Sequence, residues 1–188
     1  MTVQASDYVL FENKPFTLID IEKDKQIIDC AEFTFDTEID EEKIAQTTAC
    51  WRGYTAEYSI ENDILYGIKM INLFIDGEYL EVLSRKTKIN FSGSCIIAFE
   101  NDDDSWPLSD FLPCYLDFGE AYELYFENGH LVEKHNLASA IEKFIRIEDT
   151  KDYKSLTPQE RDAQLEKIAQ EPLKYSYSDS SYKWRCKE

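Results

Sequence analysis

Two short runs of carboxylates are the residues in this sequence most able to do chemistry. They comprise Asp36, Glu38, Asp40, Glu41 and Glu42 in the first run, and Asp102, Asp103 and Asp104 in the second. Carboxylates this dense can ligate a divalent cation, form a solvated surface or attract a basic partner. An EF-hand loop needs glycine at its sixth position and glutamate at its twelfth, and neither run supplies both. We therefore predict no metal site, and interpret the runs as binding residues for a basic protein, since many carboxylates together steer and accelerate association.

Two aromatic residues belong to the same predicted binding surface. Trp106 lies two residues after the second carboxylate run, and Tyr54 lies near the start of the strand predicted at 51–60, after the first run. Aromatic side chains are enriched at the centres of protein–protein interfaces, where they are surrounded by polar contacts. We expect Trp106 or Tyr54 to fill the apolar centre of such an interface.

An enzymatic alternative has weaker support in the residues. The chain has no phosphate-binding glycine loop, dinucleotide fingerprint, HExxH motif or nucleophile elbow. Its two histidines, His130 and His135, lie at and after a predicted turn and are expected to face solvent. No catalytic residue and no cofactor is predicted. The alternative that remains open is a small-ligand-binding protein or hydrolase-like enzyme with Glu57 or Glu123 in an aromatic pocket.

The net charge of −18 is concentrated in one part of the chain. Residues 1–150 contain 31 acidic and 12 basic residues, whereas residues 151–188 contain 7 and 8. A body this acidic repels phosphate backbones, so no direct nucleic-acid binding is expected. The basic, aromatic residues 173–187 are expected to pack back on the acidic body. An adaptor in which this tail binds a partner is a further alternative.

The sequence also indicates a compartment. Residues 1–7 lack the features of a signal peptide, and the most apolar run, residues 64–75, is too short and too polar to span a membrane. The five cysteines are odd in number and never form a CxxC pair, which argues against a disulfide framework or a zinc site. We expect a cytoplasmic protein with reduced thiols that has no membrane partner.

Alternating apolar residues and turn signals predict a strand-rich body. Hairpins are expected for strands 8–12 and 16–21 around a turn at 13–15, for 51–60 and 64–74 around 61–63, and for 122–126 and 130–133 around 127–129. Further strands are predicted at 26–35, 79–83, 88–91 and 95–99, the last buried on both faces. Residues 27 and 28 could equally begin a short helix instead of the first of these strands. The turn between 75 and 78 contains Asp-Gly, which favours a tight hairpin.

Helices are predicted after the strands. Asn136 can cap a helix over 137–145 that buries Leu137, Ile141, Phe144 and Ile145. Residues 157–160 form a capping box before a second helix with Leu165, Ile168 and Ala163 on one face, and residues 173–177 suit an edge strand. The predicted fold class is α+β, an antiparallel twisted sheet or open β-barrel of about seven to ten strands with two or three packed helices. Residues 1–150 form the acidic domain, and residues 151–188 form a C-terminal helix and tail packed on it.

Four motifs resemble sequences of bacterial immunity proteins, which accompany polymorphic or contact-dependent toxins. They are residues 50–54 (CWRGY), 91–95 (FSGSC), 114–118 (CYLDF) and 125–129 (YFENG), and the resemblance covers residues 50–144. It implies a non-enzymatic cytosolic inhibitor that neutralises one toxin domain by occluding its active surface. The acidity suits a basic toxin such as a nuclease, because the inhibitor would then mimic a phosphate backbone.

Overall fold

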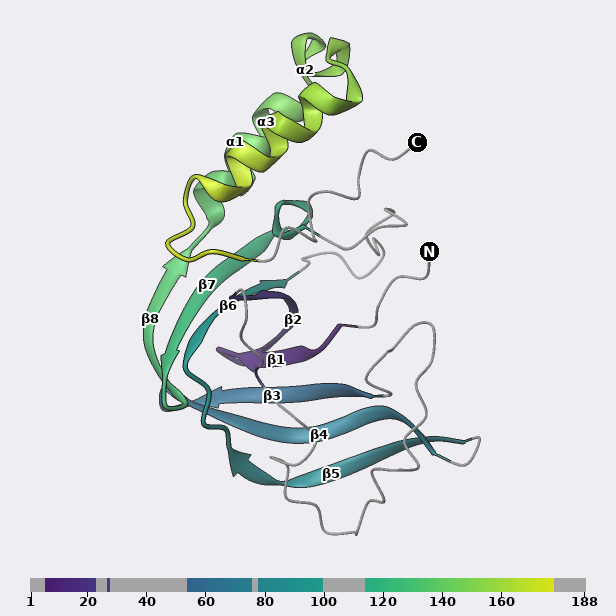
Figure 1. Cartoon of the computed structure of the whole chain (residues 1–188), viewed down its shortest axis with the longest axis vertical. Helices are drawn as coiled ribbons and strands as arrows, with labels where there is room; N and C mark the ends of the chain where they lie inside the picture. Colours follow the sequence, from purple (N-terminus) through teal and green to yellow (C-terminus); the bar gives the residue numbers. More distant parts are fainter. Residues whose placement is uncertain (1–5, 23–26, 28–53, 76–77, 100–113, 178–188) are drawn as a thin grey trace.

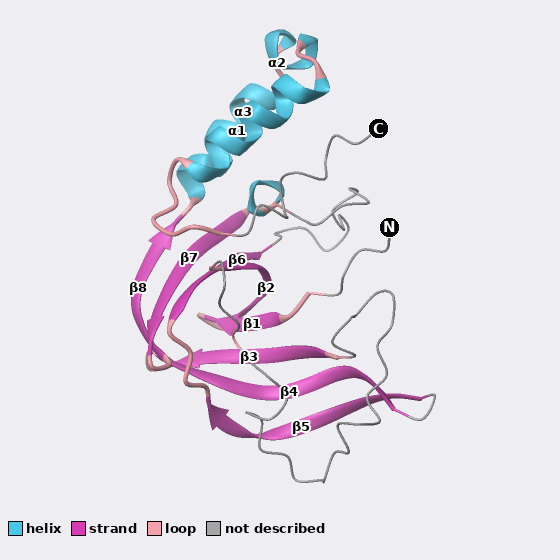
Figure 2. Cartoon of the chain, in the orientation of Figure 1, coloured by secondary structure: helices cyan, strands magenta, loops and turns pink. Residues whose placement is uncertain are grey.

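In the residues that the structure describes, the chain forms a closed seven-stranded mixed β-barrel with one additional strand and three α-helices, seen in the computed structural model (Figure 1). The structure describes residues 6–22, 27, 54–75, 78–99 and 114–177, and within them the side chains of residues 71–85 are not described. The strands form a curved sheet, and the helices extend from one end of β7 and β8 (Figure 2). The predicted α+β class is thus confirmed.

Three two-residue turns build most of the barrel. They join β1 (Tyr8–Phe11) to β2 (Lys14–Ile21), β3 (Thr55–Glu61) to β4 (Ile64–Ile75), and β7 (Glu120–Glu127) to β8 (His130–Asn136). In each turn both central residues have positive φ, which matches the twist of the flanking strands. All three hairpins were predicted. The first turn lies at Glu12 and Asn13 instead of 13–15, because Lys14 and Pro15 already pair with β1.

The glycine of the third turn has a steric role as well as a conformational one. Gly129 has φ of 76°, and a Cβ atom built on it would lie 1.9 Å from the carbonyl oxygen of Ile89. Its N–H donates a 2.8 Å hydrogen bond to the carbonyl of Phe91. The turn is therefore held directly against the segment that links β5 (Glu78–Lys88) to β6 (Gly93–Phe99).

The expectation of an entirely antiparallel sheet is wrong at one ladder. The strand order β3-β1-β2-β6-β7-β8-β4 closes on itself through the β3–β4 hairpin, and β5 adds to β4 outside this ring. Most neighbours pair antiparallel, but β1 and β3 are parallel, with Val9 opposite Tyr58. A parallel pair needs a long connection, and the chain between β2 and β3 supplies one. The shortest ladder of the ring joins β4 to β8 through a single residue pair, Ile64 with His130.

Another difference concerns the two strands predicted at 79–83 and 88–91. The structure has one strand, β5, over Glu78–Lys88. Ile89 and Phe91 follow it as buried residues of the linking segment, and the N–H of Ile89 donates to the carbonyl of Leu65. Their apolar character reflects core packing and not strand pairing.

Strand β6 separates two apolar clusters and confirms the prediction of a strand buried on both faces. Cys95 and Ile97 face the barrel interior. Ile96 and Ala98 face a second cluster formed with the helices. Successive side chains of a strand point to opposite faces, so a continuous apolar run requires a layer on each side.

The second cluster holds the helices against the barrel. It combines the 3-10 helix η3 (Tyr115–Asp117) with α1 (Ala138–Glu148) and α3 (Pro158–Gln170). The short helix α2 (Lys151–Ser155) connects α1 to α3 at their far tip (Figure 1). Helices α1 and α3 run side by side (Figure 1). They lie on either side of the predicted boundary at residue 150, and both bury side chains in this one cluster.

Helix α3 starts at the predicted capping box, whereas α1 starts one residue later than predicted, at Ala138 with Leu137 as its N-cap residue, and two buried positions differ. Asn136 Oδ1 accepts a 2.7 Å hydrogen bond from the N–H of Ala138, and Thr157 forms the expected capping box with Glu160. The side chain of Ile145 is 60% exposed, and Ala163 is exposed as well. Ala140 of α1 and Ala169 of α3 are buried instead, both in the second apolar cluster.

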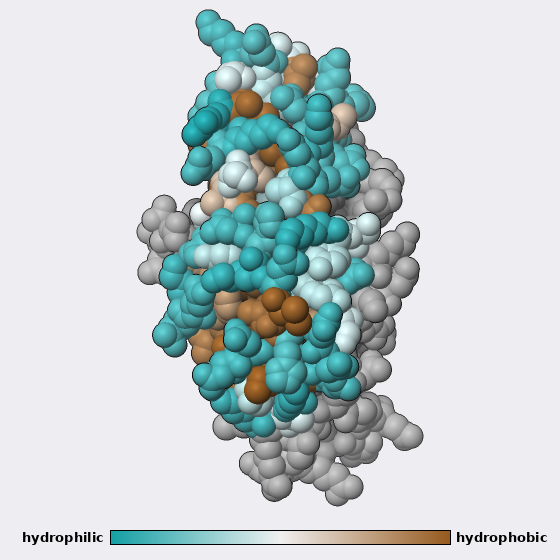
Figure 3. All heavy atoms as spheres, turned by 90° about the vertical axis from the view of Figure 1, so that its left-hand side faces the viewer, coloured by the Kyte–Doolittle hydropathy of each residue, from teal (hydrophilic) through white to brown (hydrophobic). Residues whose placement is uncertain are grey.

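The described surface is mostly hydrophilic. Figure 3 shows the face that includes β8, where apolar atoms gather in a patch over the strands. Among the described residues, the exposed large apolar side chains are Leu10, Val132 and Ile145. None of the described helices is long and apolar enough to cross a membrane.

Candidate functional site

The residues predicted to bind a partner fall into two groups. The two carboxylate runs and Trp106 lie outside the described residues. Tyr54 is described, and its side chain is only 5% exposed within the core cluster of the barrel. Tyr54 is therefore not available for the predicted role at the centre of an interface, because its ring already packs in the protein's own core.

The two carboxylates of the alternative hypothesis have different environments. Glu57 lies on β3 opposite Lys69 on β4, and their side chains form an ion pair at 3.2 Å. Glu123 lies on β7 and is only 2% exposed. A buried carboxylate is costly unless donors satisfy its oxygens, so the surroundings of Glu123 define the candidate site.

The donors to Glu123 come from one short segment that follows α3. We call residues 173–177 the strap. The N–H of Lys174 donates to both carboxylate oxygens at 3.2 and 3.1 Å, and the N–H of Tyr175 donates to Oε1 at 3.2 Å. The hydroxyl of Tyr177 donates to the same oxygen at 3.0 Å. Three donor groups therefore satisfy the carboxylate oxygens of Glu123 out of contact with water.

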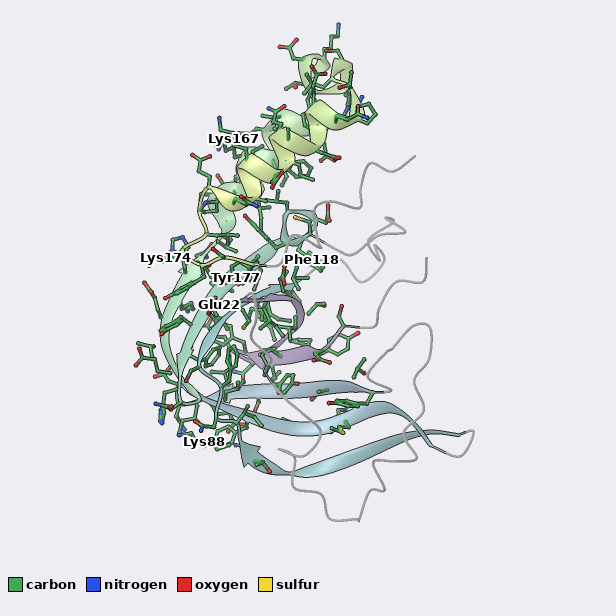
Figure 4. The ribbon with its side chains drawn as sticks, viewed as in Figure 1. Glu22, Lys88, Phe118, Lys167, Lys174 and Tyr177 are labelled. Carbon is green, nitrogen blue, oxygen red and sulfur yellow. The ribbon has the colours of Figure 1, made fainter. Side chains whose placement is uncertain are left out.

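Further contacts hold the strap along the outer face of the sheet. The rings of Tyr175 and Tyr125 stack at a centroid separation of 4.9 Å and an interplanar angle of 6°. The ammonium of Lys174 pairs with Glu133 of β8. Tyr177 forms a backbone bridge with Glu22, so the predicted edge strand at 173–177 is reduced to this one pairing. Lys174, Tyr177 and Glu22 lie close together beside β7 and β8 (Figure 4).

Strand order explains why these residues meet. Glu123 and Tyr125 are two residues apart on β7 and therefore share a face. Their cross-strand partners on β8 are His135 and Glu133. On the β6 side, the N–H of Ser94 donates to Glu22 at 2.9 Å, and the Ser94 hydroxyl also hydrogen-bonds with Tyr177. The site is a rigid sheet surface covered by an extended segment.

Burial sets the protonation of the neighbouring groups. It raises the pKa of the Cys95 thiol to about 12, with a further contribution from the negative charge of Glu123. Burial also raises the pKa of Tyr177, although the hydrogen bond with Ser94 opposes the shift. A protonated thiol is not a nucleophile, and both groups stay neutral near pH 7. The arrangement is suited to binding a peptide backbone and not to covalent catalysis.

Neither histidine joins a metal-binding arrangement. His130 is exposed, with Nε2 2.7 Å from Nζ of Lys88, and His135 is half-buried. Within the part of the chain that the structure describes, no three His, Cys, Asp or Glu residues are grouped to hold a metal ion. Cys95 and Cys114, the two described cysteines, are both buried.

Sequence reasoning named Glu123 but missed what covers it. Glu123 alternates with Tyr122 and Leu124, so it must face away from the barrel interior. That pattern alone would equally suit a solvent-exposed glutamate. The buried environment comes from the strap, more than fifty residues later. No protein-family model, curated protein or solved structure matches the chain.

Proposed function

We propose that this protein is a non-enzymatic binding protein that recognises a basic protein partner through its excess of carboxylates. The proposal rests on the excess of carboxylates over the basic side chains that are available to pair with them. On the basis of its motif resemblance, we further propose that the partner is a toxin domain such as a nuclease, and that the protein is an immunity protein that covers the toxin's active surface.

Carboxylates of the same chain neutralise most of the described basic side chains. Within the described ranges, eight Lys or Arg side chains form ion pairs with carboxylates of this chain: Lys14–Glu120, Lys69–Glu57, Lys86–Glu61, Lys134–Glu12, Lys143–Glu171, Arg146–Glu142, Lys154–Asp149 and Lys174–Glu133. The Lys14 ammonium, for example, holds the pKa of Glu120 below its usual value. Pairs of this kind consume positive charge locally and leave little for the remaining carboxylates.

The acidic excess is densest in two stretches outside the described residues, while the described ranges themselves contain 22 acidic and 13 basic residues. Residues 28–53 contain seven acidic residues and two basic ones, and residues 100–113 contain five acidic residues and no basic one. These stretches include both carboxylate runs and Trp106. Concentrated charge raises the rate of encounter with an oppositely charged protein, and an adjacent aromatic side chain supplies apolar contact area.

The environment of the buried Glu123 gives less support to the enzymatic alternative than to a binding protein. Glu123 lies among aromatic residues, as that hypothesis requires, but its oxygens accept hydrogen bonds from Lys174, Tyr175 and Tyr177. A general base needs an accessible oxygen within reach of a substrate proton. The contacts of Glu123 therefore favour a structural or binding role.

The proposal is tested with the toxin domain encoded by the adjacent gene. The association rate of the purified pair is measured at low and high salt for the wild type and for the triple variant Asp102→Asn, Asp103→Asn, Asp104→Asn. We expect the variant to associate about tenfold more slowly at low salt, with the difference shrinking at high salt.

A second triple variant, with the same change in net charge at other positions, tests whether the position of the removed charges matters. Asp63→Asn, Glu148→Gln and Asp152→Asn change the net charge by the same amount at exposed described positions. We expect it to slow association less than about threefold, since interactions beyond a Debye length are screened. Equal effects of the two triple variants, or a rate indifferent to salt, would remove the electrostatic mechanism.

A further inference from the structure

We propose that the outer face of β6, β7 and β8 around Glu123 is a peptide-binding site. In this structure the chain's own strap occupies the site, and an extended partner segment of the type Lys-Tyr-X-Tyr replaces the strap when the strap is released. This inference rests on the strap contacts and is independent of the acidic surface proposed above.

The strap contacts the sheet as a ligand peptide would. Its backbone supplies two N–H donors to Glu123, which any extended peptide offers. Its side chains add three specific contacts: the Tyr175 ring on Tyr125, the Tyr177 hydroxyl on Glu123, and the Lys174 ammonium on Glu133. Main-chain hydrogen bonds combined with alternate side-chain contacts are the usual mode of recognising an extended peptide. These contacts define the Lys-Tyr-X-Tyr pattern.

The strap can leave without disturbing the core. Among the described residues, none after Ala169 is buried in either apolar cluster, although Leu173 and Tyr177 lie partly buried against the second. Helix α3 is held by other contacts, which include Leu165, Ile168 and the 2.7 Å hydrogen bond from the Tyr115 hydroxyl to the Ala169 carbonyl. Segments with few buried apolar contacts open locally at a lower free energy than the core.

The site keeps its shape when the strap is absent. Glu123 and Tyr125 lie on β7, which pairs with β6 on one side and β8 on the other. Glu133 is directly opposite Tyr125 in the β8 register. Binding residues placed on paired strands are preorganised, so little ordering is needed when a peptide arrives. Release of the strap returns the Glu123 carboxylate to water, where its oxygens regain hydrogen bonds.

The test uses the full chain and a fluorescein-labelled synthetic peptide with the sequence of residues 171–179. In the variant Tyr175→Ala, Tyr177→Ala the strap loses its stack and its phenol contact, while every site residue on the sheet is retained. We expect this variant to bind the peptide at least tenfold more tightly than the wild type by fluorescence anisotropy, because a tethered competitor at high effective concentration has been removed.

Three controls make the result specific. Adding Glu123→Gln to the double variant should weaken peptide binding at least tenfold, whereas adding Glu57→Gln, on a strand outside the site, should leave it unchanged. A peptide with both tyrosines replaced by alanine should bind at least tenfold more weakly. If the double variant does not fold, the single variant Lys174→Glu, altered at an exposed position, weakens the strap through repulsion from Glu133 and serves instead.

The outcomes decide the proposal. It is overturned if the folded strap variants bind the peptide no more tightly than the wild type does, or if the alanine peptide binds equally well. Sedimentation equilibrium at the same concentrations distinguishes the occupant. A dimer that the peptide dissociates would mean that the site receives the strap of a second copy of this chain, which would overturn the assignment to a partner segment.

Discussion

The hydroxyl of Tyr177 donates a 3.0 Å hydrogen bond to Oε1 of Glu123, a residue 54 positions earlier in the chain. This contact brings a phenol and a buried carboxylate that are distant in the sequence into one hydrogen-bond network. The network joins the segment after α3 to the outer face of the barrel, and the stability of the strap depends on it.

Hydrogen exchange should resolve the strap as a separate unit. The amides of Lys174 and Tyr175, which donate to Glu123, should exchange through a local opening, faster than the amides that pair β6 with β7. Glu123→Gln should accelerate exchange at 174 and 175 without affecting β6. Equal protection of the strap and β6, measured residue by residue by NMR, would mean that the strap opens only with global unfolding.

The tight turn at Gly129 should not accept a side chain. Gly129→Ala combines a positive φ with a Cβ atom 1.9 Å from the Ile89 carbonyl oxygen. We expect a loss of about 1–3 kcal/mol in the free energy of unfolding from the backbone conformation alone, and more from the clash. Asn128→Gly, at a neighbouring position with φ of 49°, is the control and should be nearly neutral. Urea denaturation of both variants measures the difference.

Alkaline pH should destabilise the fold in part through Cys95. Burial raises the pKa of its thiol from 9.0 to about 12, so between these values the unfolded thiol ionises while the native one keeps its proton. The native state then binds more protons than the unfolded state, and the free energy of unfolding falls as pH rises. Cys95→Ala should lessen this slope between pH 9 and 11 in urea denaturation. An unchanged slope would exclude Cys95 as a contributor.

The same burial should protect Cys95 from alkylation. At pH 8 iodoacetamide should leave Cys95 unmodified in the folded protein and modify it in urea, because the thiolate is the reactive form. Mass spectrometry of the proteolytic peptides locates the modification. Rapid labelling of Cys95 in the native protein would contradict its buried position.

The capping box of α3 should contribute to stability in a pH-dependent way. Thr157→Ala removes the side chain that accepts from the Glu160 N–H, and should cost about 1 kcal/mol, whereas Thr157→Ser keeps the contact. Hydrogen bonds from the backbone and side chain of Thr157 hold the pKa of Glu160 below its ordinary value. The contribution of Glu160 is therefore present above about pH 4.5 and is lost as pH falls through the lowered pKa. Thermal unfolding of both variants at pH 7 and pH 3 tests both statements.

Local features of the chain were predictable because the interactions that determine them span only a few residues. Two-residue turns with asparagine, aspartate or glycine favour positive φ, and the Thr157–Glu160 box connects groups three positions apart. The continuous apolar run of β6 likewise implied layers on both of its faces. These signals established the hairpins, the helix starts and the α+β class.

Tertiary structure decided what depends on distant segments. The parallel pairing of β1 with β3, the closure of the ring, and the exposure of Ile145 follow from how separate elements meet. Glu123 is the clearest example, since alternation places it on the outer face but only the strap makes that face buried. Local sequence determines which way a side chain points, because strand geometry repeats every two residues. What covers that side chain depends on packing between elements far apart in the chain, and only the folded protein brings them together.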